Sequence, residues 1–591
     1  MSKKIKNFLI TNTNEIIYIT FLIFIFLILS ITISRHLGNI IIDCGREAYF
    51  PQQILKGKLL YKDLFNIFGP LSYQINAIFY KIFSINLSTL RLAGTINAGF
   101  ILILLYSITR FFTTKEISFA ISILIMVSCV FNPWIFNYIF PYSYAMVYAF
   151  STFLFSVLFL LLYLKSSKQF FIPLSWFFLG ISMTCKYEYV LYLIFLMFLT
   201  FILKINKKYI LYSLILFLIT PVLSFSVLFL QGLTINDLLE QFRIIKQFAL
   251  SPSLNYFYSY AVGLYPNKFN MLTNWKFFYN FCILFLLLFS SLYFWVNLSK
   301  KSPHYLYKKI LSYIFIAVFT YQFFNRLNEY INLLFCWLPL FTLLLLIPLF
   351  FKSKKSFSKE FFTTKNGTYI LLIMIAMLAS AKSFFYLNLK AYATFAFPLL
   401  FIVNSIFIIE FLPLYFKIIN KKSLKKAFFI IILIMTILFA GYLKQSLGDD
   451  VLIQTSKGSI YNHKNLAESF QASINYIDKE MKKEDSFLVL PEGIMLNFLT
   501  NHPSKSIYYA TNTPYLEPFG EEKIIDDIKK NPPEYIFINN RNSEDYGKKY
   551  ICKDYGFDLC NYVKSNYSKI EEFGTHFKME LYKKTSKIIC N

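Results

Sequence analysis

Three charged side chains stand close together in the stretch IIIDCGREAYF, residues 40–50, directly after a long apolar run. Arg46 and Glu47 follow Asp43 by three and four positions. Because apolar residues precede it, the Asp43 carboxylate is expected to be partly desolvated, and a nearby cation can steady it there. Such a carboxylate can take a proton from a hydroxyl or amine nucleophile. The simpler interpretation is a solvated loop carboxylate, and Asp43 alone does not decide between the two.

A second group of charges lies between apolar runs further along the chain. CKYEY places Lys186 and Glu188 at the outer turn of an expected helical hairpin, at a depth where charges are costly and usually functional. The alternative is a local ion pair, or side chains that extend toward the interface. Arg326 and Lys382 occupy two later outer turns. Several cations on a surface that also holds a carboxylate predict a phosphate-bearing substrate.

The elements that must position these residues are membrane helices. Of the 591 residues, 57% are hydrophobic and 20% aromatic, which is typical of a polytopic membrane protein. The first apolar run is too long for a signal peptide and lacks its cleavage pattern, so it is expected to be retained. About thirteen spans are predicted, at 16–34, 92–109, 117–131, 144–164, 170–184, 188–203, 209–230, 277–297, 310–323, 331–351, 368–382, 391–412 and 427–443.

The distribution of charge predicts the orientation. If the N-terminus is cytoplasmic, every connection expected on the cytoplasmic side is basic, in keeping with the positive-inside rule. The formal net charge of +27 comes from residues 1–443, since the later residues are close to neutral. Short basic clusters between apolar runs are not a nucleic-acid-binding face, and no nucleic-acid partner is expected. After thirteen spans the C-terminal segment lies outside the cytoplasm.

Two domains are expected. Residues 1–443 form a transmembrane domain with a first outer loop at 35–91 and a fourth outer loop at 231–276. Residues 444–591 form a small extracytoplasmic α/β domain, because runs such as SFLVLP and EYIFI read as buried strands with a helix between them. Its role is either a structural cap or selection of the acceptor. The amphipathic start of the fourth outer loop suggests a lid over the donor lipid.

Neither cysteines nor acids have the spacing of a metal site, so no dedicated metal and no cofactor is expected. Cys552 and Cys560 lie close together and can pair if their segment is extracytoplasmic. Only seven acids of the membrane part fall on the outer side. They are Asp43, Glu47, Asp63, Glu188, Asp237, Glu240 and Glu329.

The stretch DCGREAYFPQQILKGKLLYKDLFNIFGPLSY resembles the first outer loop of the GT-C membrane glycosyltransferases, in the branch of bacterial aminoarabinose transferases and protein mannosyltransferases. LGISMTCKYEYVLYL resembles the Gly…Thr-Lys hairpin of that family, and NRLNEYINLLFCWLP its Arg-containing turn. Segments of the C-terminal part, from VLPEGIMLNFLTNHPS onward, also resemble this branch. The resemblance therefore extends over nearly the whole chain.

The resemblance implies transfer of a hexosyl or pentosyl group from a polyprenyl-phosphate donor to a glycan, lipid or protein acceptor, with inversion at the anomeric carbon. It also implies a bacterial inner-membrane enzyme in contact with membrane lipids. Asp43 becomes the base, Lys186 and Arg326 the partners of the donor phosphate, and Arg46 and Glu47 the supports of the loop or contacts to the sugar. Glu188 and Lys382 join them as substrate-binding residues, and Tyr61 and Asp63 are expected to hold the shape of the loop.

One departure from the family concerns the second outer loop, where many relatives carry a further acid. CVFNPWIFNYIFPYSYAM has none, so a two-carboxylate or metal-assisted scheme would need Glu47 or Glu188 in its place. The alternative function is a transporter or flippase of lipid-linked glycans. That reading expects internal repeats and charges near the bilayer midplane, and the sequence has no such repeat. A third reading, a binding module on a membrane anchor, would not require so many spans.

Overall fold

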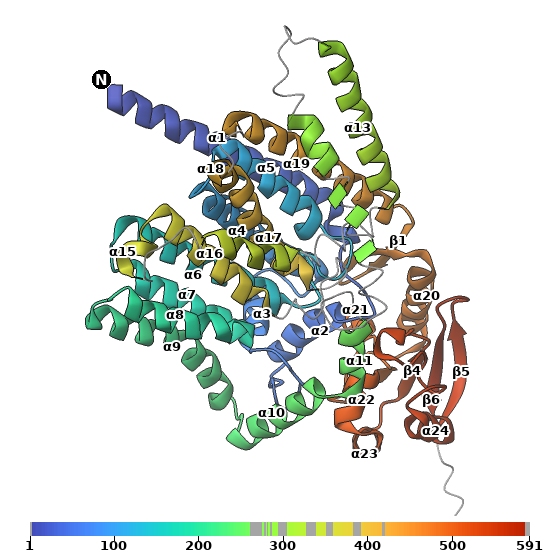
Figure 1. Cartoon of the computed structure of the whole chain (residues 1–591). Coiled ribbons are helices and arrows are strands. Elements are labelled where there is room, and N and C mark those ends of the chain that lie inside the picture. The colour runs from blue at the N-terminus through green and yellow to red at the C-terminus, as the bar shows by residue number, and fades with distance from the viewer. Residues whose placement is uncertain are drawn as a thin grey trace, which may run out of the picture.

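A computed structural model describes residues 3–260, 275–276, 279–280, 282–283, 286–293, 304–326, 338–349, 358–381, 392–415 and 420–585. Within these residues the chain is helical up to Ser446, and its strands follow (Figure 1). The bounded helices before the strands are α1 (Lys3–Ile33), η1 (Ser34–His36), α2 (Cys44–Leu55), α3 (Leu71–Ile82), α4 (Leu87–Arg110), α5 (Lys115–Ile125), η2 (Met126–Val130), α6 (Tyr144–Ser166), α7 (Phe171–Cys185), η3 (Tyr187–Tyr189), α8 (Val190–Ile202), α9 (Lys207–Leu230), α10 (Ile235–Ala249), α11 (Pro252–Tyr260), α13 (Tyr305–Asn325), α15 (Lys359–Phe362), α16 (Lys365–Ala379), α17 (Ala393–Ile406), η5 (Phe407–Phe411), α18 (Leu412–Tyr415) and α19 (Lys421–Ser446).

Six segments of the described residues are helical, long enough and apolar enough to cross a membrane. They are Glu15–His36, Leu87–Arg110, Tyr144–Ser166, Lys207–Leu230, Thr394–Tyr415 and Lys421–Ser446. Four shorter apolar helices accompany them, at Phe171–Cys185, Tyr187–Ile202, Leu338–Leu349 and Lys365–Ala379. The chain is therefore an integral membrane protein, as its composition predicts.

The count of thirteen spans stays a prediction. The runs expected at 170–184 and 188–203 are α7 and α8, with 15 and 13 residues, which at about 1.5 Å per residue do not reach across a hydrocarbon core of about 30 Å. The runs expected at 277–297 and 331–351 lie partly outside the described residues. The hairpin between α7 and α8 is present, with Lys186 directly after α7.

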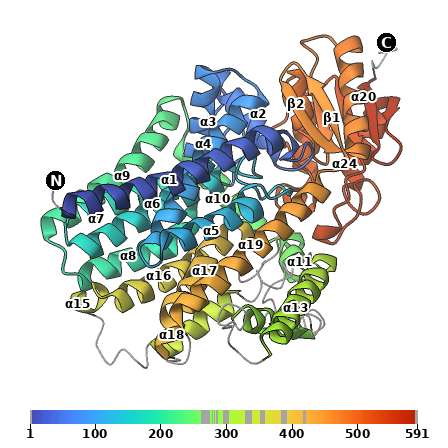
Figure 2. The ribbon, with the colours of Figure 1, turned by 90° about the horizontal axis from the view of Figure 1, so that it is seen from above.

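The long helices run side by side, and the strands gather at one end of this bundle (Figures 1 and 2). Helices α2 and α3 of the first outer loop lie near that end. Ten of the twelve residues of α2 are buried, so this polar helix is an internal element and not a surface loop. Helix α3 buries Tyr73, Asn76 and Tyr80 against the protein. Its apolar residues Ile78 and Ile82 are 56% and 67% exposed, as expected of a helix that lies in the membrane interface.

The C-terminal α/β region, residues 450–585, begins with the antiparallel hairpin of β1 and β2. A four-stranded sheet follows, in the order β3-β4-β6-β5, in which β3 and β4 are parallel and the other neighbours antiparallel. The elements of this region are β1 (Asp450–Thr455), β2 (Gly458–His463), α20 (Lys464–Glu480), β3 (Phe487–Leu490), α21 (Met495–Thr500), α22 (Thr513–Phe519), α23 (Glu521–Lys530), β4 (Tyr535–Asn539), η6 (Glu544–Tyr546), α24 (Phe557–Asn566), β5 (Tyr567–Phe573) and β6 (Met579–Lys584). The strands and helix expected from SFLVLP, EYIFI and EEKIIDDIKK are thus present.

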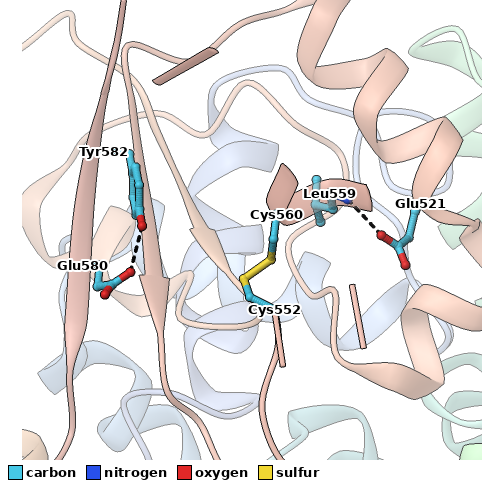
Figure 3. Close-up of a disulfide and its surroundings, with 6 residues drawn as sticks. All are labelled: Glu521, Cys552, Leu559, Cys560, Glu580 and Tyr582. Atoms are coloured by element: carbon cyan, nitrogen blue, oxygen red, sulfur yellow. Dashed lines mark hydrogen bonds between the residues drawn. A yellow bond between two sulfur atoms is a disulfide. The ribbon is translucent and has the colours of Figure 1, made fainter. Parts of the chain in front are cut away.

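A disulfide joins Cys552 and Cys560 beside the start of α24 (Figure 3). The backbone N–H of Leu559 donates to the Glu521 carboxylate at 2.8 Å, which ties α24 to α23. The pairing that the sequence left open is therefore made.

The described part of the fourth outer loop connects the helical bundle to the C-terminal region. Helix α10 starts with a capping box, in which Thr234 and Asp237 satisfy each other's backbone N–H groups. The Phe248 ring lies 5.0 Å from that of Tyr515 in α22. The Phe257 ring, in α11, stacks 5.2 Å from that of Tyr546 in η6. These contacts hold the loop against the end of the bundle.

Candidate active site

A cavity of about 260 Å³ lies where the first outer loop, the α7–α8 hairpin and the C-terminal region meet. Asp43 and Arg46 line it from the first loop, and Lys186 from the hairpin. Glu492 and Arg541 line it from the C-terminal region. Aromatic side chains complete its wall, among them Phe68, Tyr142, Phe257, Tyr392, Tyr515 and Tyr546. Segments more than 400 residues apart in sequence thus line one cavity.

Asp43 occupies the N-cap position of α2 and is more exposed than Arg46 and Glu47, with 24% of its side chain accessible. Its φ of +47° is unusual for a residue with a side chain. Such strained positions persist where the surrounding structure enforces them, and they are common at functional sites. The Arg46 guanidinium donates to Asp43 Oδ1 at 2.9 Å, which orients the carboxylate.

Arg46 is fully enclosed and connects three elements. Its Nε donates to Glu47 Oε1 at 3.1 Å, and its Nη2 donates to the Tyr142 carbonyl at 2.9 Å. Its guanidinium also lies 5.1 Å from the centre of the Phe68 ring. Because each end of the guanidinium is held, Arg46 is a rigid support for Asp43.

Glu47 is completely buried and accepts three hydrogen bonds. Besides Arg46, the Tyr73 hydroxyl donates to it at 2.9 Å and the Tyr144 backbone N–H at 2.8 Å. Burial raises the pKa of Glu47, while the Arg46 charge and these donors oppose the increase. Three donors around one carboxyl group favour its ionised form, so we infer that Glu47 neutralises Arg46 at neutral pH. Glu47 does not line the cavity, so it supports the loop and is not placed to contact a sugar.

Lys186 is buried and carries its charge to the cavity wall. Its Nζ donates to the Tyr142 hydroxyl at 2.6 Å and lies 3.3 Å from Glu188, whose side chain is 26% exposed. The rings of Phe68 and Tyr142 lie 4.9 and 5.2 Å from the ammonium group. The local ion pair with Glu188 is thus present, and Lys186 lines the cavity at the same time.

The loop containing Lys186 is locked to the first outer loop through Gly69. The Gly69 N–H donates to the carbonyl of Cys185 at 3.0 Å. A Cβ at this position would lie 1.9 Å from the carbonyl oxygen of Thr184, so only glycine permits the approach. This contact sets the position of Lys186 relative to the first loop.

The C-terminal region supplies a second carboxyl group. Asp43 N–H donates to Glu492 Oε1 at 3.4 Å, and the other oxygen of Glu492 lies 2.9 Å from Arg541 Nη1. Burial raises the pKa of Glu492 to about 7, although the Arg541 charge opposes the increase. Burial also acts to lower the pKa of Arg541, but the charge of Glu492 outweighs it and the pKa is raised. The two groups therefore form a buried pair next to Asp43.

Three of the expected substrate-binding residues, Glu47, Glu188 and Arg326, do not line this cavity. Arg326 follows the last residue of α13, is exposed, and does not line the cavity. Lys382 lies outside the described residues. Tyr61 and Asp63 make bonds within the first loop: the Tyr61 hydroxyl donates to the Phe68 carbonyl at 2.7 Å, and Asp63 accepts from Leu59 N at 2.8 Å. Among the residues that the structure describes, no group of three or more His, Cys, Asp or Glu could hold a metal ion.

Sequence reasoning missed Tyr142, Glu492 and Arg541. From the sequence, the second outer loop was notable only for its lack of an acid. In the structure Tyr142 of that loop accepts from Arg46 with its carbonyl and from Lys186 with its hydroxyl. Glu492 and Arg541 each follow a short buried strand, and polar residues just beyond the carboxyl ends of parallel strands often form ligand sites. That pattern was visible in SFLVLPE and EYIFINNR, but the parallel pairing that makes it meaningful was not.

These features define a polytopic helical membrane protein with a charged cavity at the end where its α/β region lies. The solved structures to which this chain is similar include ArnT from Cupriavidus metallidurans bound to undecaprenyl phosphate, with a TM-score of 0.41 and 10% identity over 96% of this chain and 98% of that one. The apo form of the same protein gives a TM-score of 0.37 at 11% identity, with 95% and 98% covered. The oligosaccharyltransferase of Archaeoglobus fulgidus, in complex with zinc and sulfate, gives 0.39 at 14% identity, with 88% and 65% covered. No protein-family model and no curated protein matches the sequence.

Proposed function

We propose that the protein is a GT-C-type glycosyltransferase that moves a sugar from a polyprenyl-phosphate donor to an acceptor at the outer face of the membrane, with inversion at the anomeric carbon. A partly exposed carboxylate and a buried cation facing one aromatic-lined cavity carry this proposal. Asp43 is the base, and Lys186 binds the phosphate of the donor. The donor is a substrate, and the scheme needs no cofactor.

In the proposed step, the acceptor oxygen or nitrogen forms a bond to the anomeric carbon of the sugar. The bond from that carbon to the phosphate oxygen breaks, and its electron pair leaves with the lipid phosphate. The proton of the acceptor passes to Asp43, which Arg46 keeps in position. The Lys186 ammonium stabilises the negative charge that grows on the departing phosphate.

The arrangement proposed in the membrane follows from the charge pattern. The N-terminus lies in the cytoplasm of a bacterium, the chain spans the inner membrane, and the C-terminal α/β region lies outside. The exposed apolar side chains of α3 then rest in the outer leaflet beside the entrance for the lipid donor. Arg326 is proposed as a second partner of the donor phosphate. The sugar is a hexose or pentose.

The test is an assay of the purified protein in lipid nanodiscs with a panel of polyprenyl-phosphate sugars, in which release of the lipid phosphate is measured. With the donor that the wild-type protein cleaves, Asp43→Asn is expected to lower the rate by about 10²- to 10⁴-fold, because it removes the base and keeps the shape of the side chain. Asp526→Asn, an exposed acid of α23, is the matched control and leaves the rate unchanged.

Full activity of Asp43→Asn refutes the role of Asp43. Movement of an intact lipid-linked sugar across the bilayer, with no cleavage of any donor, refutes the transferase and favours the flippase.

A further inference from the structure

We propose that the carboxyl edge of β3 and β4 is the acceptor subsite, and that it takes a neutral hydroxyl group such as that of a sugar rather than a phosphate. This inference rests on the proposed transferase function. It names the chemical class of the acceptor and places its binding in a part of the chain that the proposed donor site does not use. It is carried by four observations on Glu492, Arg541 and Asn512, and by the aromatic rings beside them.

The first observation is the position of the two charges in the sheet. Strands β3 and β4 are parallel and pair Leu490 with Ile538, so their carboxyl ends lie at one edge of the sheet. Glu492 lies two residues after Leu490, the last residue of β3, and Arg541 lies two residues after Asn539, the last residue of β4. In open α/β sheets ligands bind at this edge, because loops leave it on both sides.

The second observation is that this edge is built against the proposed base. Glu492 accepts the backbone N–H of Asp43 at 3.4 Å. Helix α2 also approaches α21 so closely that a Cβ on Gly45 would lie 2.5 Å from Met495 N. An acceptor held at the edge of the sheet therefore reaches Asp43 without a movement of the C-terminal region.

The third observation is the local charge. Arg541 lies 2.9 Å from Glu492 and 3.9 Å from Asp545, so one cation faces two acids. The wall is neutral when Glu492 is protonated and carries one negative charge when it is not. A phosphate acceptor would be repelled, since the Arg541 charge is already matched, whereas a hydroxyl group adds no charge.

The fourth observation is unused hydrogen-bonding capacity. Arg541 Nε and Asn512 Oδ1 are buried and have no hydrogen-bond partner among the described residues. One is a donor and the other an acceptor, and both residues line the cavity. Buried polar groups without partners are unfavourable, and a hydroxyl group can accept from one and donate to the other.

Aromatic rings stand beside these polar groups. The Tyr546 ring lies 5.8 Å from the Arg541 guanidinium and stacks on Phe257. Tyr515 lines the same wall. Flat apolar rings next to polar groups suit a sugar, whose ring has both apolar faces and hydroxyl edges.

The first experiment measures binding without any donor. Methyl glycosides and the corresponding 6-phosphates are compared by saturation-transfer NMR on the full-length protein in nanodiscs. The neutral glycosides are expected to bind, and Asn512→Ala is expected to weaken their binding by about 5-fold, as loss of one hydrogen bond predicts. Asn542→Ala, an exposed asparagine close to Arg541, is the matched control and leaves binding unchanged.

Tighter binding of the phosphorylated glycosides, or equal binding by Asn512→Ala and the wild-type protein, overturns the subsite. If Asn512→Ala does not fold, Arg541→Lys replaces it, because it keeps the charge and removes the Nε donor; binding equal to that of the wild-type protein then overturns the subsite.

The second experiment separates this inference from the proposed function. With a cleavable donor, Asn512→Ala is expected to raise the acceptor KM by about 5-fold and to leave the donor KM unchanged. An unchanged acceptor KM with normal donor cleavage overturns the subsite alone. Absence of donor cleavage in the wild-type protein overturns the transferase.

Discussion

Replacing Glu47 with glutamine tests whether the proposed active site depends on a buried ion network. In the wild-type protein Glu47 is fully buried, pairs with Arg46 at 3.1 Å and accepts two further hydrogen bonds. Glutamine keeps the size of the side chain and one acceptor oxygen but removes the charge. Arg46 is then left in a buried site with Asp43 as its remaining carboxylate partner.

The size of the effect follows from the burial of the pair. Breaking a buried ion pair by removing one partner costs about 3–5 kcal/mol, because the other charge stays desolvated. Glutamine retains part of the hydrogen bonding, so the lower end, about 3 kcal/mol, is expected for the free energy of unfolding. Because Arg46 orients Asp43 at 2.9 Å, loss of the Glu47 contact is also expected to loosen this support and lower the rate of transfer.

The assay is thermal unfolding of purified protein in one detergent, followed by donor cleavage. Glu47→Gln is expected to melt several degrees below the wild-type protein. Glu468→Gln is the control: Glu468 is 53% exposed and 3.9 Å from Lys464, so its loss is worth less than about 1 kcal/mol. The double variant Arg46→Met/Glu47→Leu should melt above Glu47→Gln, because it removes both charges.

A wild-type melting temperature for Glu47→Gln would refute this reasoning. It would mean that Glu47 is already neutral in the folded protein, and that burial of Arg46 does not require a negative charge on Glu47.

Three further predictions concern the cavity and its supports. Lys186→Met is expected to weaken binding of polyprenyl phosphate by about 10-fold or more, because a hydrogen bond to a charged group contributes about 1.5–3 kcal/mol. Equal affinity of the variant and the wild-type protein in a lipid-binding assay would contradict the role of Lys186 in phosphate binding. Gly69→Ala is expected to reduce the yield of folded protein, because its Cβ meets the Thr184 carbonyl, whereas Gly99→Ala meets only the edge of a ring at 3.5 Å and should be neutral in size-exclusion chromatography. The pKa of Glu492 is raised from 4.5 to about 7, so the folded state binds the proton more tightly than the unfolded state. The free energy of unfolding should therefore fall by on the order of 3 kcal/mol as the pH rises from about 4.5 to about 7. Glu492→Gln should remove that part of the decline in melting temperature with pH. The same pH dependence of melting temperature in the variant and the wild-type protein would contradict the raised pKa of Glu492.

Local patterns were sufficient for the parts of the site that lie within one loop. The spacing of Asp43 and Arg46 on the first turn of α2 brings them within 2.9 Å, and this is a short-range effect of helix geometry. The position of Lys186 also followed from sequence, because two apolar runs between basic clusters leave one turn for it. For Glu47 the sequence offered either support of the loop or contact to the sugar, and its burial against Tyr73 and Tyr144 was not predicted.

The same local reasoning predicted the apolar runs of α7 and α8 but did not decide whether each of them crosses the membrane. Continuous apolar runs predict helices, but periodicity does not say whether a helix crosses the bilayer or ends within it. The turn after Cys185 stops α7 at 15 residues, where Gly69 of a distant loop approaches its end. The length of α7 follows from hydropathy, whereas its contact with Gly69 is tertiary and has no local signal.

By itself the sequence determined that this is a membrane protein with a strand-containing C-terminal part, because hydropathy and periodicity act over short distances. It also singled out Asp43 and Lys186, because charges next to apolar runs stand out. Only the tertiary structure decided that Glu492 and Arg541 complete the cavity. Their approach to Asp43 joins segments 449 or more residues apart, and such contacts arise from packing of α2 against the C-terminal region rather than from any local pattern.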